Sequence, residues 1–190
     1  ILTDFVKEVD FKTFPFKIRT EKLEIESYST IIATGAKAKW LGVEGEKKFM
    51  GLGVSACATC DGFFFKGKNV VVVGGGNTAV EEALFLSNLC KKVTLVHRRD
   101  RLRAEQILQK RLGEKKNVEI LWNSVVDKII GDESKRCISS IIISNNLSKK
   151  KKELNLDGIF VAIGHSPTTE IFREYINMDE DGYITVSYTH

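Results

Sequence analysis

The stretch that decides the fold is Asn69-Val-Val-Val-Val-Gly-Gly-Gly-Asn-Thr-Ala79, in which an apolar run passes directly into three glycines. The apolar run predicts a buried strand, and the glycines predict a tight turn. Apolar residues then recur at helical spacing on one face, at Ala79, Ala83, Leu86 and Cys90. We expect a helix over residues 77–89 and a second strand over residues 92–96. Residues 68–99 therefore form a strand–helix–strand unit of the α/β class.

The glycine turn has the spacing of a dinucleotide-binding fingerprint, Gly74-x-Gly76-x-x-Ala79. In that fingerprint Gly74 permits the tight turn, Gly76 lets backbone N–H groups approach a pyrophosphate, and Ala79 allows close helix packing. The residues expected to touch the nucleotide are Gly74, Gly75, Gly76, Asn77, Thr78 and Ala79. A plain tight turn is the alternative, and the strand before it and the helix after it favour the nucleotide site.

The end of the second strand indicates which nucleotide is bound. An acidic residue there would accept hydrogen bonds from the ribose 2′-hydroxyl of NAD, but this strand ends in His97, Arg98 and Arg99, with Arg103 close behind. Arginines at this place offer charge-assisted contacts to a 2′-phosphate. The four residues therefore favour NADP(H), and a solvated basic loop is the alternative.

A second constellation is Cys57-Ala-Thr-Cys60 followed at once by Asp61. Two thiols at this spacing can close a reversible disulfide, and an adjacent carboxylate can deliver or remove a proton during exchange. A zinc site would need two more ligands at close spacing, which the sequence does not offer, so we expect no metal; a chance pair is the other alternative. Cys90 and Cys137 lie in apolar segments, and we expect both to be buried and inert.

The composition describes a globular chain of 190 residues, 43% of them hydrophobic and 28% charged, and excludes disordered, collagenous and coiled-coil proteins. The net charge of +4 includes the lysine run 149–152 and does not call for nucleic acid. The longest apolar stretches have strand length, so we expect no membrane span. One close cysteine pair suits a reducing cytoplasm. Because the chain begins at Ile1 and carries no leader, we expect a fragment.

The remaining segments are expected to be mostly strands and loops. Residues 1–32 predict a β-meander that feeds an apolar strand ending at Gly35, and residues 35–67 predict a loop with short helical turns. Glu81 and Glu82 are expected in the first helical turn. Further expectations are a helix at 104–112, a strand at 118–121, meander strands at 125–130, 137–144 and 154–161 joined by a lysine-rich turn at 145–152, a short helix at 169–175 and a hairpin at 179–182.

Two further motifs remain open. The aromatic run Phe63-Phe-Phe65 follows the cysteine pair and can be core or an apolar rim for a protein partner. His165 and Ser166 are read as a loop at a strand end that lines the nucleotide site or forms a simple turn.

Several runs together resemble the bacterial-type, low-molecular-weight thioredoxin reductases. These runs are Gly53-Val-Ser-Ala-Cys-Ala-Thr-Cys-Asp-Gly-Phe-Phe64, Val73-Gly-Gly-Gly-Asn-Thr-Ala-Val-Glu-Glu82, His97-Arg-Arg99 with Arg103, and Phe160-Val-Ala-Ile-Gly-His-Ser-Pro167. The resemblance implies an FAD-dependent homodimer in which electrons pass from NADPH through the flavin to the disulfide and then to thioredoxin.

The resemblance also implies residue roles. Cys60 would face the flavin, Cys57 would attack thioredoxin, and Asp61 would donate the proton. Ile163 and Gly164 would touch NADPH. Thr34 and Gly35 would touch FAD, and the segments 33–35 and 162–164 look like the linkers about which the two domains rotate.

The expected domains are a partial FAD-binding domain at 1–36, an NADPH-binding domain with the redox pair at 37–166, and a partial return into the FAD-binding domain at 167–190. The family's glycine-rich FAD fingerprint and its Gly-Asp motif are not found in this sequence. Leu52 stands where some relatives have a basic residue. The expected fold is thus a Rossmann-like α/β domain with a central parallel sheet and a β-meander, plus FAD-domain segments.

Two other functions remain as alternatives. The first is an NADH-dependent flavoprotein disulfide reductase that feeds a peroxidase, against which His97-Arg-Arg99 speaks. The second is a non-catalytic NADPH-binding module, which the absence of flavin absorbance would favour.

Overall fold

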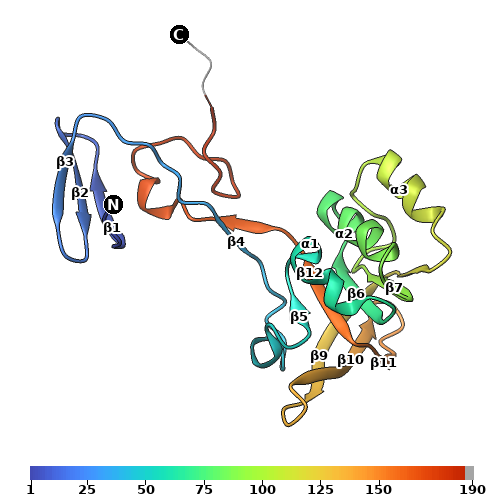
Figure 1. Ribbon diagram of the computed structural model, residues 1–190. Helices are drawn as coiled ribbons and strands as arrows, with labels where there is room; N and C mark the ends of the chain where they lie inside the picture. The colour runs from blue at the N-terminus through green and yellow to red at the C-terminus, as the bar shows by residue number, and fades with distance from the viewer. Residues whose placement is uncertain (187–190) are drawn as a thin grey trace. The chain divides into compact units, whose positions relative to one another are not determined.

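The computed structural model describes residues 1–186 and divides into two compact units (Figure 1). The central unit is Ala38–Gly164, and the terminal unit combines Ile1–Lys37 with the described residues from His165 onward. The chain therefore passes from the terminal unit into the central unit and back again.

The central unit is built on a five-stranded sheet in which every neighbouring pair is parallel. The strands, in spatial order, are β5 (Val54–Ser55), β12 (Gly158–Ala162), β6 (Asn69–Gly74), β7 (Lys92–Val96) and β8 (Val118–Leu121). Strands β6, β7 and β12 are buried on both faces, as strands of a covered parallel sheet are. The predicted α/β fold with a central parallel sheet is confirmed.

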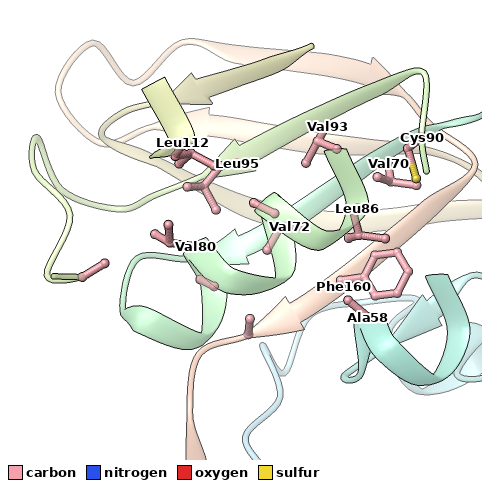
Figure 2. Packing of buried hydrophobic residues seen from close by; sticks show 14 of the residues in the cluster. Ala58, Val70, Val72, Val80, Leu86, Cys90, Val93, Leu95, Leu112 and Phe160 are labelled. Atoms are coloured by element: carbon pink, nitrogen blue, oxygen red, sulfur yellow. The ribbon is translucent and has the colours of Figure 1, made fainter. Parts of the chain in front are cut away.

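Helix α2 (Asn77–Ser87) packs one face against this sheet (Figure 2). Its Val80 and Leu86 lie with Val72, Leu95 and Phe160 in a single buried cluster. Each such side chain contributes about 1.5–3 kcal/mol when it leaves water. The burial of Ala79, Ala83, Leu86 and Cys90 confirms the predicted apolar face.

The ends of the helices differ from the prediction. Helix α2 ends at Ser87 rather than at residue 89. Because its N-cap is Gly76, its first turn is over before Glu81, so the placement of Glu81 and Glu82 in that turn was wrong. Helix α3 (Gln106–Gly113) begins two residues later than predicted.

The other face of the sheet is covered by an antiparallel meander, in the order β11 (Lys151–Asn155), β10 (Cys137–Asn145) and β9 (Ser124–Asp132). The predicted third meander strand at 154–161 was wrong, because this stretch contains the end of β11 and most of β12. Between these strands Asp157 turns the chain, since its carboxylate accepts from Asn69 N at 2.9 Å. The lysine-rich turn ends at Lys150, and Lys151 already lies in β11, where its Nζ is 3.1 Å from Asp127.

Residues between the units' boundary and β6 form short pieces, as the glycine spacing predicts. They are the 3₁₀ turns η1 (Lys47–Phe49) and η2 (Gly62–Phe65) and the four-residue helix α1 (Ala58–Asp61). None of the helices within residues 1–186 is long and apolar enough to cross a membrane.

The terminal unit contains the predicted meander, β1 (Val6–Asp10), β2 (Phe16–Thr20) and β3 (Glu24–Ser27), paired antiparallel in that order. The apolar strand predicted to end at Gly35 was wrong: the chain there is irregular, and Ile31 is 93% exposed without a sheet to pair with. The next strand is β4 (Ala36–Ala38), which pairs with β13 (His165–Pro167).

After β13 the chain forms the 3₁₀ turn η3 (Glu170–Phe172) in place of the predicted helix at 169–175. Its buried Phe172 stacks on Phe11, with ring centroids 6.1 Å apart. Met178 and Ile184 form the antiparallel bridge of the expected hairpin.

Candidate functional site

The cysteine pair forms a disulfide on helix α1. Cys57 and Cys60 are joined with their Cα atoms 5.3 Å apart. Cys57 is the N-cap of α1, and its sulfur accepts a hydrogen bond from the backbone N of Cys60 at 3.2 Å. An N–H group directed at a sulfur favours the thiolate form once the bond is reduced. Cys60 is exposed, and Cys57 is half-buried.

Ser55 and Asp61 flank the disulfide and contact each other. The buried Ser55 hydroxyl donates to Asp61 Oδ2 at 2.6 Å and accepts from Cys57 N at 3.0 Å. The structure therefore brings the predicted proton carrier, Asp61, into one hydrogen-bonded group with Cys57.

Glu82 connects the disulfide helix to α2. Its Oε1 accepts from Ala58 N at 3.3 Å, while its Oε2 is buried without a hydrogen-bond partner among the described residues. Burial raises the pKa of the Glu82 carboxyl above its ordinary value. Helices α1 and α2 thus meet at a buried carboxyl group.

The aromatic run after the disulfide divides between the two readings left open by the sequence. Phe65 packs edge-on against Phe160, with centroids 5.4 Å apart, and belongs to the core. Phe63 and Phe64 remain 65% and 74% exposed next to the redox helix. Two of the three rings are therefore exposed beside the disulfide, and their contact with a protein partner stays a prediction.

The glycine turn has the geometry of a nucleotide cradle. A Cβ on Gly74 would lie 2.3 Å from the carbonyl oxygen of Ala162 and 2.6 Å from Cβ of Ala79, so strand, turn and helix approach closely. A Cβ on Gly76 would meet nothing within 4 Å, and no side chain caps the N-terminus of α2. The first N–H groups of a helix have no partner within it, and this uncapped N-terminus therefore suits an anion.

The basic loop after β7 is tied to the glycine turn. Asn77 donates to Glu105 Oε1 at 3.2 Å and accepts from Glu105 N at 2.9 Å, and Arg103 N donates to Gly75 O at 2.7 Å. The side chains of Arg98, Arg99 and Arg103 are exposed. They lie on a loop that is held at the cradle.

His97 is placed beneath the turn rather than on the surface. It is 5% exposed, its Nε2 lies 2.9 Å from Arg101 O, and a Cβ on Gly75 would fall 2.1 Å from its ring. In this structure the ring supports the turn and the basic loop. Its contact with a nucleotide stays a prediction.

The end of β12 lies beside the glycine turn, because Ala162 pairs with Gly74. Ile163 and Gly164 follow Ala162 directly and so reach the same edge of the sheet, where Ile163 is 38% exposed. Thr34 and Gly35 belong to the terminal unit, where Gly35 O accepts from Thr168 N at 2.9 Å. His165 and Ser166 lie exposed in β13.

The two remaining cysteines differ from each other. Cys90 is buried, and desolvation raises its pKa to about 11. Cys137 is exposed, so its predicted burial was wrong: it is the first residue of β10, and the core buries the next residue, Ile138, instead.

Within residues 1–186 no group of three or more potential metal ligands is found.

Ser55, Glu82 and Glu105 are site residues that the sequence reasoning missed. Ser55 had a local signal, since a serine two residues before a cysteine can bond to its backbone N–H. Glu82 and Glu105 act across 24 and 28 residues of sequence, respectively, and local patterns carry no such information.

The cradle at Gly74–Ala79 fits one dinucleotide, because an uncapped helix end and an open Gly76 meet at the carboxyl edge of the sheet. A second strand–glycine turn–helix element is not found in the part of the chain that the structure describes. The residues present therefore do not supply a cradle for FAD as well.

The pyridine nucleotide-disulphide oxidoreductase family model matches residues 1–189. The chain is 52% identical to a thioredoxin reductase of Rickettsia conorii over 97% of this chain and 60% of that protein. It is 44% identical to a thioredoxin reductase of Vibrio cholerae over 98% of this chain and 58% of that protein.

Among solved structures, the thioredoxin reductase of Lactococcus lactis in its FR conformation superposes with a TM-score of 0.86 at 38% identity, over 97% of this chain and 60% of that one. The chain thus spans about 60% of the length of the relatives it matches. With a parallel α/β sheet, a glycine turn between strand and helix, and a CxxC disulfide in one unit, the chain belongs to the pyridine nucleotide-disulphide oxidoreductase family.

Proposed function

We propose that this chain carries the nucleotide-binding and disulfide-bearing part of a thioredoxin reductase. The observation that carries the proposal is that the cradle and the disulfide lie on directly contacting helices of one unit, since Ala58 of α1 bonds to Glu82 of α2. The identities of about 50% to thioredoxin reductases support the same function.

The nucleotide of this proposal is NADPH. The pyrophosphate would lie over Gly76 at the N-terminus of α2, with Gly74, Gly75, Asn77, Thr78 and Ala79 forming the turn and the first helical positions. Arg98, Arg99 and Arg103 would bind the 2′-phosphate, and His97 would hold their loop. Ile163 and Gly164 would line the same edge. NADPH supplies a hydride, which is two electrons and one proton.

The disulfide is the proposed exit for these electrons. Reduction breaks the Cys57–Cys60 bond and places one electron on each sulfur. The backbone N–H that reaches the Cys57 sulfur supports Cys57 as the thiolate that attacks thioredoxin, and leaves Cys60 for the cofactor side. Asp61 would carry the second proton.

FAD is the proposed flavin of the whole protein. The residues described here do not form a cradle for it, so we assign no step to FAD and propose only that Thr34 and Gly35 touch it. We further propose the domain boundaries 1–36, 37–166 and 167–190, in which the outer segments belong to the FAD-binding domain. The homodimer and the cytoplasmic location are proposed on the same likeness to thioredoxin reductases.

Thioredoxin is the proposed protein substrate. The exposed rings of Phe63 and Phe64 next to the disulfide offer it an apolar contact. Leu52, which is half-buried, gives no charge at the position where some relatives have a basic residue.

The proposal is tested by titrating the chain with NADPH and with NADH while following tryptophan fluorescence. Trp122 is a suitable reporter, because its ring lies 6.2 Å from that of His97. Wild type should prefer NADPH, and Arg98→Ala with Arg99→Ala should reduce that preference about 10- to 100-fold, the effect of losing charge-assisted hydrogen bonds.

The matched control is Lys150→Ala with Lys152→Ala, which removes the same charge from exposed positions of the β10–β11 hairpin. It should keep the preference of wild type. Equal affinity of wild type for both nucleotides would contradict the assignment of NADPH.

A further inference from the structure

The hydroxyl group of Ser55 is a buried, hydrogen-bonded group beside the disulfide. The Ser55 residue is 7% exposed, and its strand β5 pairs with β12 opposite the fully buried Phe160. The backbone that carries the hydroxyl is therefore fixed by the central sheet, whereas the neighbouring Asp61 lies at the end of a four-residue helix.

The hydrogen bonds of this hydroxyl have a defined direction. It has one proton to donate, and the distance to Asp61 Oδ2, 2.6 Å, is much shorter than the 3.4 Å to Cys57 O. The proton therefore goes to the carboxylate. The oxygen accepts from Cys57 N at 3.0 Å, so Ser55 is bonded on both sides.

We propose that Ser55 is a positioning residue of the Cys57–Cys60 centre, which holds the Asp61 carboxylate and the Cys57 backbone in one arrangement so that Asp61 can exchange protons with the cysteine sulfurs. The inference rests on the proposed function, since it assumes that the disulfide is redox-active. Ser55 itself exchanges no proton with the sulfurs and acts through Asp61.

The step that it assists balances with dithiothreitol as reductant. One thiol of dithiothreitol attacks a cysteine sulfur; an S–S bond forms there, the Cys57–Cys60 bond breaks, and the leaving sulfur takes the electron pair. Asp61 accepts the proton of the incoming thiol and returns it to the leaving sulfur. The second thiol then closes oxidised dithiothreitol, and its proton goes to the second cysteine.

The test measures the rate of this reduction between about pH 6 and pH 9, the range that spans ordinary thiol ionisation. The full chain is used in a Cys137→Ser background, because the exposed Cys137 would react with the quenching reagent. Timed samples are alkylated, and the modified cysteines are located by mass spectrometry.

Ser55→Ala should slow the reduction about 10- to 100-fold, which is the loss expected when a group that transfers a proton is misplaced by about 1 Å. Ser55→Thr keeps the hydroxyl. Ser55→Val places a side chain of nearly the same shape as threonine there, without the hydroxyl. The threonine variant should stay within about 3-fold of wild type and the valine variant should be as slow as the alanine variant, on the same principle.

The decisive comparison is a double-mutant cycle with Asp61→Asn. If Ser55 acts through Asp61, Ser55→Ala should change the rate less than about 2-fold in the Asp61→Asn background, because interacting residues are not additive. Its pH profile should also resemble that of Asp61→Asn. If Ser55→Ala does not fold, the threonine and valine variants provide the same comparison.

Two results would overturn the inference. One is an equal rate of reduction for wild type, Ser55→Ala and Ser55→Val. The other is that Ser55→Ala slows the reduction by the same factor in the wild-type background and in the Asp61→Asn background. Failure of the proposed function looks different: wild type would still be reduced by dithiothreitol at a rate that depends on Ser55, but the reduced chain would not reduce oxidised thioredoxin.

Discussion

The glycine turn allows a prediction in which neighbouring substitutions separate folding from nucleotide binding. The two changes are Gly74→Ala and Gly76→Ala, each of which adds one methyl group. At Gly74 the methyl would lie 2.3 Å from Ala162 O and 2.6 Å from Cβ of Ala79, and the backbone has φ of +155°. At Gly76 it would meet nothing within 4 Å, and φ is −90°.

The expected magnitudes follow from these contacts. Overpacking costs about 1–3 kcal/mol and a strained backbone costs about 1–3 kcal/mol, so Gly74→Ala should lower the free energy of unfolding by about 2–6 kcal/mol. Gly76→Ala should leave it unchanged or raise it by about 0.5 kcal/mol, because alanine restricts the unfolded chain. The methyl would, however, occupy the open space in which the pyrophosphate is proposed to lie.

The assay is urea unfolding followed by tryptophan fluorescence. Both tryptophans, Trp40 and Trp122, belong to the central unit, so the signal reports on the unit that contains the turn. With a denaturant slope of about 2 kcal/mol per molar, Gly74→Ala should lower the midpoint by about 1–3 M. A nucleotide titration of the folded Gly76→Ala variant then measures binding, which we expect to be lost.

Two results would refute this reasoning. An equal fall of the midpoint in both variants would mean that the turn is not packed as described. Normal NADPH binding by Gly76→Ala would mean that the nucleotide does not approach the turn there.

Three further predictions concern charge, loop position and thiol reactivity. Burial raises the pKa of Glu82, so the folded state keeps this proton at higher pH than the unfolded state. The free energy of unfolding should therefore fall as the pH rises from the ordinary pKa of 4.5 through the raised pKa. Urea titrations at several pH values should show this fall in wild type and a flatter one in Glu82→Gln. Asn77→Ala removes two hydrogen bonds to Glu105, each worth about 1 kcal/mol, and should loosen the basic loop. The ratio of NADPH affinity to NADH affinity should then fall several-fold. An equal loss of affinity for both nucleotides would contradict this prediction. Iodoacetamide at pH 8 should modify Cys137 and leave Cys90 intact, as peptide mapping would detect, because burial raises the pKa of Cys90 to about 11.

The parts of the fold that were predictable are those with strong local patterns. A strand–turn–helix unit is predicted by consecutive residues: the valine run at 70–73, the glycines after it and the apolar face of α2. The meander β1–β3 is equally local, because alternating residues and short turns encode it.

The errors arose where tertiary contacts decide. Residues 154–161 alternate like one strand, but the bond between Asp157 and Asn69, 88 residues away in sequence, turns the chain from the meander into the parallel sheet. Ile31 looks like part of a strand, yet no described strand lies beside it.

The candidate site shows the same division. Cys57, Cys60 and Gly76 were found because their spacing alone indicates chemistry. Glu82 and Glu105 were missed because their partners are set by helix packing and loop closure. Burial of His97 was also hidden from the sequence, since a histidine beside arginines gives no sign of its depth.

The measurement that tests the central claim most directly is electron transfer from the reduced chain to thioredoxin. The chain with Cys137→Ser is reduced, separated from the reductant and mixed with oxidised thioredoxin, and the thiols on both proteins are counted with time. We predict that thioredoxin gains two thiols while the Cys57–Cys60 disulfide closes, and that Phe63→Ala with Phe64→Ala slows the transfer. Thiols that stay on the chain, although a small disulfide oxidises them readily, would contradict the assignment of thioredoxin as the substrate.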